Sequence, residues 1–271
     1  MKLFRRIRYD LMEKNNTRKP ALPARPTDSY GRAGRYFKYA IGEIVLVVIG
    51  ILIALSINNW NENRKQRAEE IETLKNIKSD FTNAIIEFEE NNNFRERIIS
   101  TTQVLYSIIH AKDYNYSKQQ LDSLMSDLFI NPTYNGQSET LNILFNSGKI
   151  NIISNDSIKN ALVLWPQQVE DVTEDEIYSS NIIFNDLHPI LKRYVSLYDI
   201  NNSISYKGYK LFSNNNQSTF TTDYKGLFND REFEGTLSAR ELPLSVSLIQ
   251  TKDLIRTARN IIRLIDNDLK D

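Results

Sequence analysis

The hydrophobic residues of this chain follow two patterns, one unbroken and one periodic. Residues 39–57 carry a single charge, that of Glu43, and residues 44–55 hold nothing more polar than glycine. Crossing a hydrocarbon core of roughly 30 Å takes about 20 helical residues. A helix from a soluble core would show a polar face, and this stretch has none. The pattern therefore predicts one transmembrane helix over residues 39–60.

The charges on either side of this stretch predict its orientation. Residues 1–40 carry a net charge of +8, whereas residues 61–271 carry −7. Cytoplasmic flanks of membrane helices are enriched in Lys and Arg. We therefore expect the helix in the inner membrane, with residues 1–38 cytoplasmic and residues 61–271 periplasmic. A cleaved signal peptide is the competing interpretation, because Ala54 and Ser56 resemble a cleavage site, but the long basic segment before them disfavours it.

Aromatic and basic side chains flank the predicted span at the positions of a membrane interface. Trp and Tyr are enriched at both interfaces. Near the N-terminus, arginines lie between apolar residues at helical spacing, which predicts a short basic helix on the anionic inner leaflet. Alternatively, these arginines only set the topology. Residues 15–35 contain three prolines and two glycines and predict a flexible linker. The predicted membrane-interface residues are Arg5, Arg6, Arg8, Tyr36, Tyr39 and Trp60.

One stripe of the predicted span differs from its other faces. Its residues, spaced four, three, four and three apart, are Glu43, Val47, Gly50, Ala54 and Ile57. Gly50 and Ala54 form a small-xxx-small pair, which lets two membrane helices approach closely. The stripe predicts contact with a partner helix, although Glu43 lies shallow enough to be an interfacial residue instead. Ion or proton coupling through Glu43 is a third interpretation.

Beyond the span the pattern becomes periodic and helical. An apolar stripe begins at Ile71 and Leu74 and resumes beyond the three asparagines at residues 91–93, where we expect a bend or break. A last stripe covers residues 254–265, and Pro243 marks the start or a kink of that helix. We expect the first and last helices to pair. The fold class is all-α: a single transmembrane helix continuing into a long helix and an extracytoplasmic helical bundle of four or five helices.

Turn and cap signals divide the predicted bundle. Ser117 and Gln120 form a capping-box pattern, and Gly148 is a natural residue to follow a helix end. Residues 150–153 predict a short extended piece, after which Asn155 or Asp156 caps a helix that Pro166 kinks or restarts. Residues 200–225 are rich in Asn, Ser, Thr and Tyr and predict a long loop or a small irregular insertion.

The residue types present exclude several kinds of chemistry. The chain has no cysteine and two histidines, and it contains no Gly-rich phosphate loop and no zinc or nucleophile motif. Asp186 with His188 is a candidate acid–base or metal pair, but a histidine at a helix end is the simpler interpretation, as it is for His110. We therefore predict no enzyme activity, no metal and no cofactor. The acidic outer region disfavours nucleic acid as a partner.

Two further clusters have both a functional and a structural interpretation. The acidic run contains Glu170, Asp171, Glu174, Asp175 and Glu176, and it predicts a solvated helix face more strongly than a cation site. The basic–aromatic patch contains Tyr194, Tyr198, Tyr206 and Tyr209 with Lys192, Arg193, Lys207 and Lys210. Sugar or anionic-polymer binding is one interpretation of this patch, and ordinary packing is the one we favour.

Two segments resemble a family of uncharacterised single-span bacterial membrane proteins of the Bacteroidota. The first is GEIVLVVIGILIALSINNWNE at residues 42–62 with IETLKNIKSD after it, and the second is ETLNILFNSGKINIISNDSIKNALVLW at residues 139–165. The resemblance covers most of the chain and implies a basic tail, one span and a helical soluble part. The linker at residues 15–35 is longer than the family pattern. No activity is carried over from the resemblance.

These observations leave three functional hypotheses. In the first, the chain is a membrane-anchored periplasmic helical module that senses a ligand or binds a protein partner or a second copy of itself. In the second, it is an accessory subunit of a membrane transport or motor complex and contacts a larger subunit through Glu43, Gly50 and Ala54. In the third, it is a membrane-anchored enzyme with an unfamiliar site. The lipid bilayer is an expected partner in all three.

Overall fold

The computed structural model describes residues 29–136, 139–206, 208–212 and 216–270. Contacts divide the chain into two units, Met1–Asn63 and Arg64–Asp271, which we describe separately. Arg5, Arg6 and Arg8 lie outside the described residues, as does the side chain of Tyr36. The predictions for the basic tail and its linker therefore stay predictions.

The first unit consists, in its described part, of helix α2, which runs from Ser29 to Ala111 and so extends into the second unit. Side chains of residues 39–66 are exposed on every face of α2. Ile44, Leu46 and Leu52 keep 63%, 58% and 56% of their surface exposed. This is the one described helix that is long and apolar enough to cross a membrane, and the predicted helix is confirmed to that extent.

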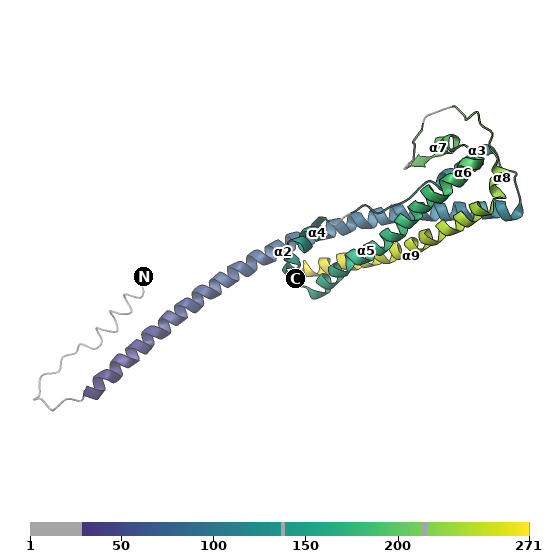
Figure 1. Ribbon diagram of the computed structural model, residues 1–271. Helices are drawn as coiled ribbons and strands as arrows, with labels where there is room; N and C mark the ends of the chain where they lie inside the picture. The colour runs from purple at the N-terminus through teal and green to yellow at the C-terminus, as the bar shows by residue number, and fades with distance from the viewer. Residues whose placement is uncertain (1–28, 137–138, 207, 213–215, 271) are drawn as a thin grey trace, which may run out of the picture. The chain divides into compact units, whose positions relative to one another are not determined.

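The second unit is a helical bundle in which α5 and α9 lie beside the second part of α2 (Figure 1). A two-residue antiparallel pair, with Tyr206 opposite Tyr209, is the only extended structure in the described residues. The all-α prediction is confirmed. The other elements are α3 (Lys118–Asp127), α4 (Glu139–Asn146), η1 (Lys149–Ile152), α5 (Asp156–Ile182), η2 (Ile183–Leu187), α6 (His188–Tyr194), α7 (Leu197–Ser203), β1 (Ser205–Tyr206), β2 (Tyr209–Lys210), α8 (Tyr224–Phe228) and α9 (Arg231–Asp268).

The three long helices share one spacing of buried residues. On each helix the inward positions recur three and four residues apart, which keeps one face turned towards the other two helices. On α2 these positions are Leu74, Ile77, Phe81, Ala84, Phe88, Asn91, Arg95, Ile98, Thr102 and Leu105. On α5 they are Ile158, Leu162, Trp165, Val169, Val172, Glu176 and Ser179. On α9 they are Phe233, Leu237, Arg240, Leu244, Ser247, Thr251, Leu254, Ala258, Ile261 and Ile265.

Apolar side chains at these positions form two separate cores. The first core includes Phe88, Trp165 and Leu254. The second core includes Ile98 and Leu244 and also holds residues from α3, α6 and α8. Each fully buried Leu, Ile or Phe contributes roughly 1.5–3 kcal/mol, so these two clusters dominate the stability of the bundle.

Helices α2 and α9 pair in antiparallel orientation, as expected for the first and last helices. Glu89 accepts a hydrogen bond of 2.6 Å from Arg259, and Glu96 accepts one of 3.0 Å from Lys252. Each step of seven residues along α2 thus matches a step of seven in the opposite direction along α9. These exposed pairs each contribute little free energy, but they lie on both sides of the level where the two cores meet.

The structure corrects three local predictions. Residues 91–93 do not break α2, because Asn91 and Asn92 are buried and hydrogen-bonded inside the bundle. Pro243 does not start the last helix, since α9 begins at Arg231 and contains Pro243 in its interior. The expected extended piece at residues 150–153 is instead the 3₁₀ helix η1.

Three other local predictions are confirmed, whereas the expected restart of a helix at Pro166 is wrong. Ser117 and Gln120 form a capping box at the start of α3, and Gly148 adopts a φ of 68°, which favours glycine. Asn155 caps α5 by accepting hydrogen bonds from two backbone N–H groups. α5 continues through Pro166. Residues 200–225, expected to be a loop, contain the end of α7, both short strands and the first residues of α8.

A polar clasp closes the end of the bundle at which α9 terminates. Arg67 donates hydrogen bonds to Glu70 at 2.8 Å and to the carboxylate and carbonyl of Asp268 at 2.9 and 2.8 Å. Glu70 in turn accepts hydrogen bonds from the backbone N–H and hydroxyl of Ser154 at 2.6 and 2.7 Å. The clasp joins α2, the turn before α5 and the last turn of α9.

Burial opposes ionisation of Glu70, but the hydrogen bonds from Ser154 and Arg67 outweigh it and hold the pKa of Glu70 below its usual value. A carboxylate with a lowered folded-state pKa stabilises the fold above its unfolded pKa of about 4.3 and loses that contribution as pH falls through the folded value. Glu70→Gln should therefore lower the free energy of unfolding at pH 7 by about 1.5–3 kcal/mol.

Denaturant unfolding at pH 7 and at lower pH measures this difference, which should shrink as the pH drops below about 4. Glu72→Gln is the matched control, because Glu72 lies two residues along and is exposed. A Glu70→Gln deficit that is independent of pH would contradict the role of the ionised carboxylate.

Candidate functional site

The predicted partner-helix stripe lies on one exposed face of α2, within the first unit. Its members are Glu43, Val47, Gly50, Ala54 and Ile57. Val47 and Ile57 keep 56% and 61% of their surface exposed. A Cβ placed on Gly50 would meet no described atom within 4 Å. The structure therefore places the predicted residues along one exposed face of a single helix, with open space around Gly50.

The predicted aromatic markers lie at the two ends of the apolar stretch. Tyr39 and Trp60 keep 61% and 62% of their surface exposed. Both side chains project from the helix surface at the positions where its apolar stretch begins and ends. An amphipathic ring at each end fits an apolar segment whose two ends meet water.

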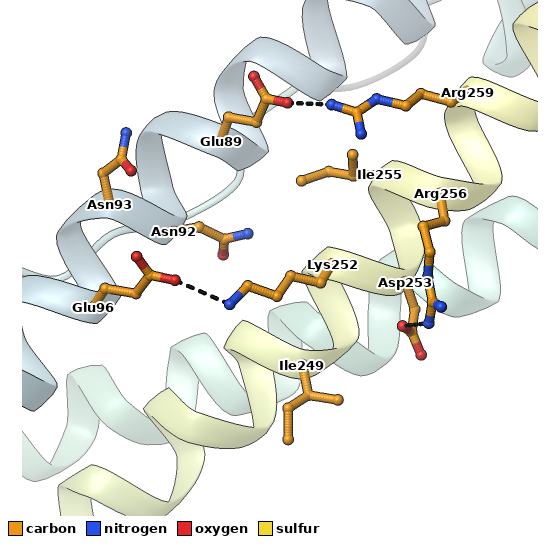
Figure 2. Close-up of a pocket in the computed structure, with 10 residues that line it drawn as sticks. All are labelled: Glu89, Asn92, Asn93, Glu96, Ile249, Lys252, Asp253, Ile255, Arg256 and Arg259. Carbon is orange, nitrogen blue, oxygen red and sulfur yellow. Dashed lines mark hydrogen bonds and ion pairs between the residues drawn. The ribbon is translucent and has the colours of Figure 1, made fainter.

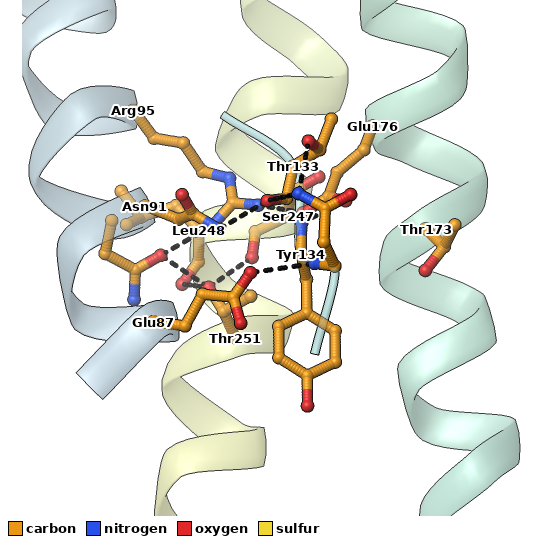
Figure 3. Close-up of polar contacts among 12 residues, drawn as sticks. Glu87, Asn91, Arg95, Thr133, Tyr134, Thr173, Glu176, Ser247, Leu248 and Thr251 are labelled. Carbon is orange, nitrogen blue, oxygen red and sulfur yellow. Dashed lines mark hydrogen bonds and ion pairs between the residues drawn. The ribbon is translucent and has the colours of Figure 1, made fainter. Parts of the chain in front are cut away.

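A second feature, which the sequence did not reveal, is a polar layer between the two cores of the bundle (Figure 3). Its centre is an ion pair between Arg95 of α2 and Glu176 of α5, which expose 0% and 3% of their side chains. Glu176 also accepts a hydrogen bond of 2.9 Å from the backbone N–H of Tyr134. The buried residues of the polar layer are Asn91, Asn92, Arg95, Glu176, Ser179, Ser247 and Thr251.

The third long helix joins the polar layer through Thr251. Its hydroxyl lies 2.6 Å from Oδ1 of Asn92 and 2.6 Å from the carbonyl oxygen of Ser247. Asn92 Oδ1 also accepts a hydrogen bond of 3.0 Å from Arg95. Asn91 donates to the carbonyl of Thr133 at 3.0 Å and so ties the connection after α3 to the same level. One connected network therefore joins α2, α5 and α9.

Burial dominates the electrostatics of the central pair. It lowers the pKa of Arg95, and the attraction of Glu176 only partly restores it. Burial likewise raises the pKa of Glu176, against the hydrogen bond from Tyr134 and the attraction of Arg95. Arg95 Nε has no hydrogen-bond partner among the described residues. The pair is thus costly to bury, and a buried ion pair often adds no net stability compared with apolar residues of similar size.

A buried arginine also joins α9 to the end of α3. Arg240, 2% exposed, donates hydrogen bonds to the carbonyl oxygens of Leu128 at 2.6 Å and Ile130 at 2.5 Å. These carbonyls lie just beyond α3, where helix carbonyls lack partners within the helix. Burial lowers the pKa of Arg240 to about 9. Its role is to hold α3 against α9.

An open depression of about 760 Å³ lies on the surface between α2 and α9 (Figure 2). Three acidic and three basic side chains line it, and Glu89–Arg259 and Glu96–Lys252 pair across it. Because the two signs balance, the depression gives no strong preference for an anion or a cation. Ile249, 64% exposed, supplies an apolar contact at its edge.

The remaining sequence candidates are dispersed. No hydrogen bond joins Asp186 to His188, both of which are described, and the His188 ring instead packs 4.7 Å from Phe129 and 5.4 Å from Phe184. Burial, and then Lys192, lowers the pKa of His188. His110 contacts Glu234 at 2.8 Å at the end of α2. No group of three potential metal ligands occurs among the described residues.

The two side-chain clusters also differ from a binding site. Glu170, Asp171 and Glu174 are exposed, as expected for a solvated face, but Glu176 turns into the core, which corrects its assignment to that face. In the basic–aromatic patch, the hydroxyl of Tyr194 donates to Asp230 at 2.9 Å. Tyr209 is 74% exposed. The side chains of Tyr206 and Lys207 lie outside the description.

Fold and surface define a helical protein that has, within its described residues, one helix of membrane-spanning length and composition. The model of a family described as a family of unknown function, DUF6090, matches residues 43–190, more than half of the chain. The chain belongs to this family. No curated protein and no solved structure matches it.

The matched residues cover the stripe and both members of the central ion pair, but they stop before α9. α9 supplies Leu254, Ala258 and Ile261 to the first core and Leu244 to the second. The family-matched segment therefore cannot close either core by itself, and the C-terminal helix completes the bundle.

Removal of one member of the central pair tests the electrostatic description. Arg95→Met leaves Glu176 buried without its cation, so the free energy of unfolding should fall by about 3–5 kcal/mol. Denaturant unfolding followed by circular dichroism measures this change. Arg256→Met is the matched control, because Arg256 has a side chain that is 75% exposed, and it should change stability by less than about 0.5 kcal/mol. Equal effects of the two substitutions would contradict burial of the pair.

Proposed function

We propose that this protein is a single-pass inner-membrane protein whose helical bundle acts in the periplasm as an interaction or ligand-sensing module. The observation that carries the proposal is the run of apolar side chains at residues 44–55, exposed all round α2. Exposed apolar area costs about 25 cal/mol per Å² in water. A bilayer would remove that cost for this segment, of which none is buried in the first unit.

The charge distribution supports the orientation. Residues 1–40 carry +8 and the outer region −7, which favours a cytoplasmic N-terminus. Arg5, Arg6 and Arg8 would then contact the anionic inner leaflet. The resemblance to Bacteroidota membrane proteins supports a bacterial inner membrane and a periplasmic domain. The shared three–four spacing of the long helices supports coiled-coil packing in this domain.

The arrangement of polar groups favours interaction over catalysis. The deeply buried carboxylates of Glu176 and Glu70 are committed to ion pairs within the bundle, and the surface depression has balanced charges. An interaction through the span would use the stripe of Glu43, Gly50 and Ala54, because small residues allow close helix contact. The partner is a second copy of the chain or another membrane protein.

A second candidate function is that of an accessory subunit in a transport or motor complex. Glu43 favours it, because a carboxylate on a lipid-facing stripe is costly and is better accommodated against a partner helix. A stoichiometric multi-span protein bound to the chain would favour this candidate, whereas a second copy would favour the first.

A reporter enzyme fused after Asp271 tests the topology. An enzyme that is active only after export should be active, because the positive charges hold the opposite end in the cytoplasm. The same reporter fused before Tyr39 is the control and should be inactive. An inactive reporter at the C-terminal position, at equal expression, would overturn the orientation.

Substitutions in the span test the stripe. Gly50→Leu places a bulky side chain where a partner helix would approach, and Glu43→Gln removes the charge, so both should reduce the amount of partner copurified in mild detergent by about tenfold or more. Val45→Leu adds bulk on the opposite face and is the control. Copurification that is unchanged in both stripe variants, at equal expression, would exclude this surface as the interface.

A further inference from the structure

The buried faces of α2, α5 and α9, which we call their seams, repeat every seven residues. A helix that is shifted by seven residues therefore presents a similar face to its neighbours. A shift of α5 by seven residues moves it about 10 Å along its neighbours. After that shift Val172 would occupy the level of Trp165 or Ser179, and apolar side chains would still face apolar side chains at most levels. Hydrophobic contact alone therefore distinguishes weakly between the native alignment and the shifted one.

The central ion pair makes the two alignments differ in free energy, in favour of the native one. In the native alignment Arg95 lies against Glu176. The residues seven positions from Glu176 are Val169 of α5 and Ile183, the first residue of η2, and both are apolar. A shift by one repeat would leave Arg95 facing an apolar side chain and Glu176 facing Phe88 or Thr102, so neither charge would meet an opposite charge. A buried charge without its partner costs several kcal/mol, far more than a small mismatch in apolar packing.

The position of the pair fits this role. It lies between the two cores, and Thr251 of α9 bonds to Asn92, which also accepts from Arg95. The same network therefore depends on the alignment of all three helices at one level. Burial penalises both charges, and Arg95 Nε is left without a partner among the described residues. Both features fit a pair that specifies the alignment of the helices better than a pair that stabilises the fold.

We infer that the Arg95–Glu176 pair is a register lock, which fixes the axial alignment of α5 against α2 and adds no net stability of its own. The inference concerns the bundle and stands apart from the proposed membrane location and interaction. A lock of this kind keeps a long, repetitive helix bundle in one alignment.

Double electron–electron resonance between two spin labels tests the lock in the full chain, purified in detergent. The chain has no cysteine, so Asn93→Cys on α2 and Glu170→Cys on α5 introduce one label each at exposed positions. With Arg95 and Glu176 in place, one narrow distance distribution is expected. In the Arg95→Met/Glu176→Leu variant a second distance between the labels should appear, because in part of the molecules α5 would be shifted along its neighbours by about 10 Å. The denaturant midpoint of this variant should stay equal or rise.

Arg240→Met is the matched control, because it also replaces a buried arginine of a seam with methionine but leaves the pair intact. It should keep the single distance between the two labels. An unchanged narrow distribution in the Arg95→Met/Glu176→Leu variant would overturn the lock, since the clasp and the connections would then suffice to fix the alignment. Failure of that variant to fold, judged by circular dichroism, would also overturn it, because the pair would then be required for stability.

Discussion

Helix α2 has to bury two different kinds of surface, and the rest of the structure depends on this constraint. Over residues 44–55 it is apolar on every face, and from Leu74 onward it is apolar on one face only. An all-round apolar surface is satisfied by lipid, whereas a one-sided seam is satisfied by neighbouring helices. Helices α5 and α9 cover the one-sided seam, and the proposed bilayer would cover the segment that is apolar on every face.

The seam on α2 also explains why the chain needs its last helix. The segment that matches the family contains α2, α3, α4 and α5 but stops before α9. Without α9 both cores would lose apolar contacts on one side, at a cost set by the exposed area. The clasp of Arg67, Glu70 and Asp268 then holds the end of α9 against the beginning of the seam. The polar layer sets the alignment of the same three helices at their middle.

Sequence patterns predicted the parts of this structure that depend on local properties. The exposed apolar stretch, the pairing of the first and last helices, and the caps at Ser117 and Asn155 follow from spacing and residue type alone. The central pair could not be predicted, because Arg95 and Glu176 lie 81 residues apart and Glu176 belongs to an acidic run that reads as a solvated face. The three asparagines suggested a break for the same reason: their partners come from distant segments. A stricter count of the seven-residue spacing places Arg95 in line with Phe81 and Phe88, and it could have indicated that Arg95 is buried, although not that Glu176 is its partner.

A scan of single spin labels along α2 from Tyr39 to Ala111, in lipid bilayers, tests the central claim most directly. Accessibility to oxygen, which partitions into lipid, and to a water-soluble nickel complex would be measured at each position. The account predicts high oxygen accessibility at every position of residues 44–55. From Leu74 onward it predicts a helical alternation between labels exposed to the nickel complex and labels inaccessible to both reagents. Nickel-complex accessibility throughout residues 44–55, or an equally uniform pattern beyond Leu74, would contradict it.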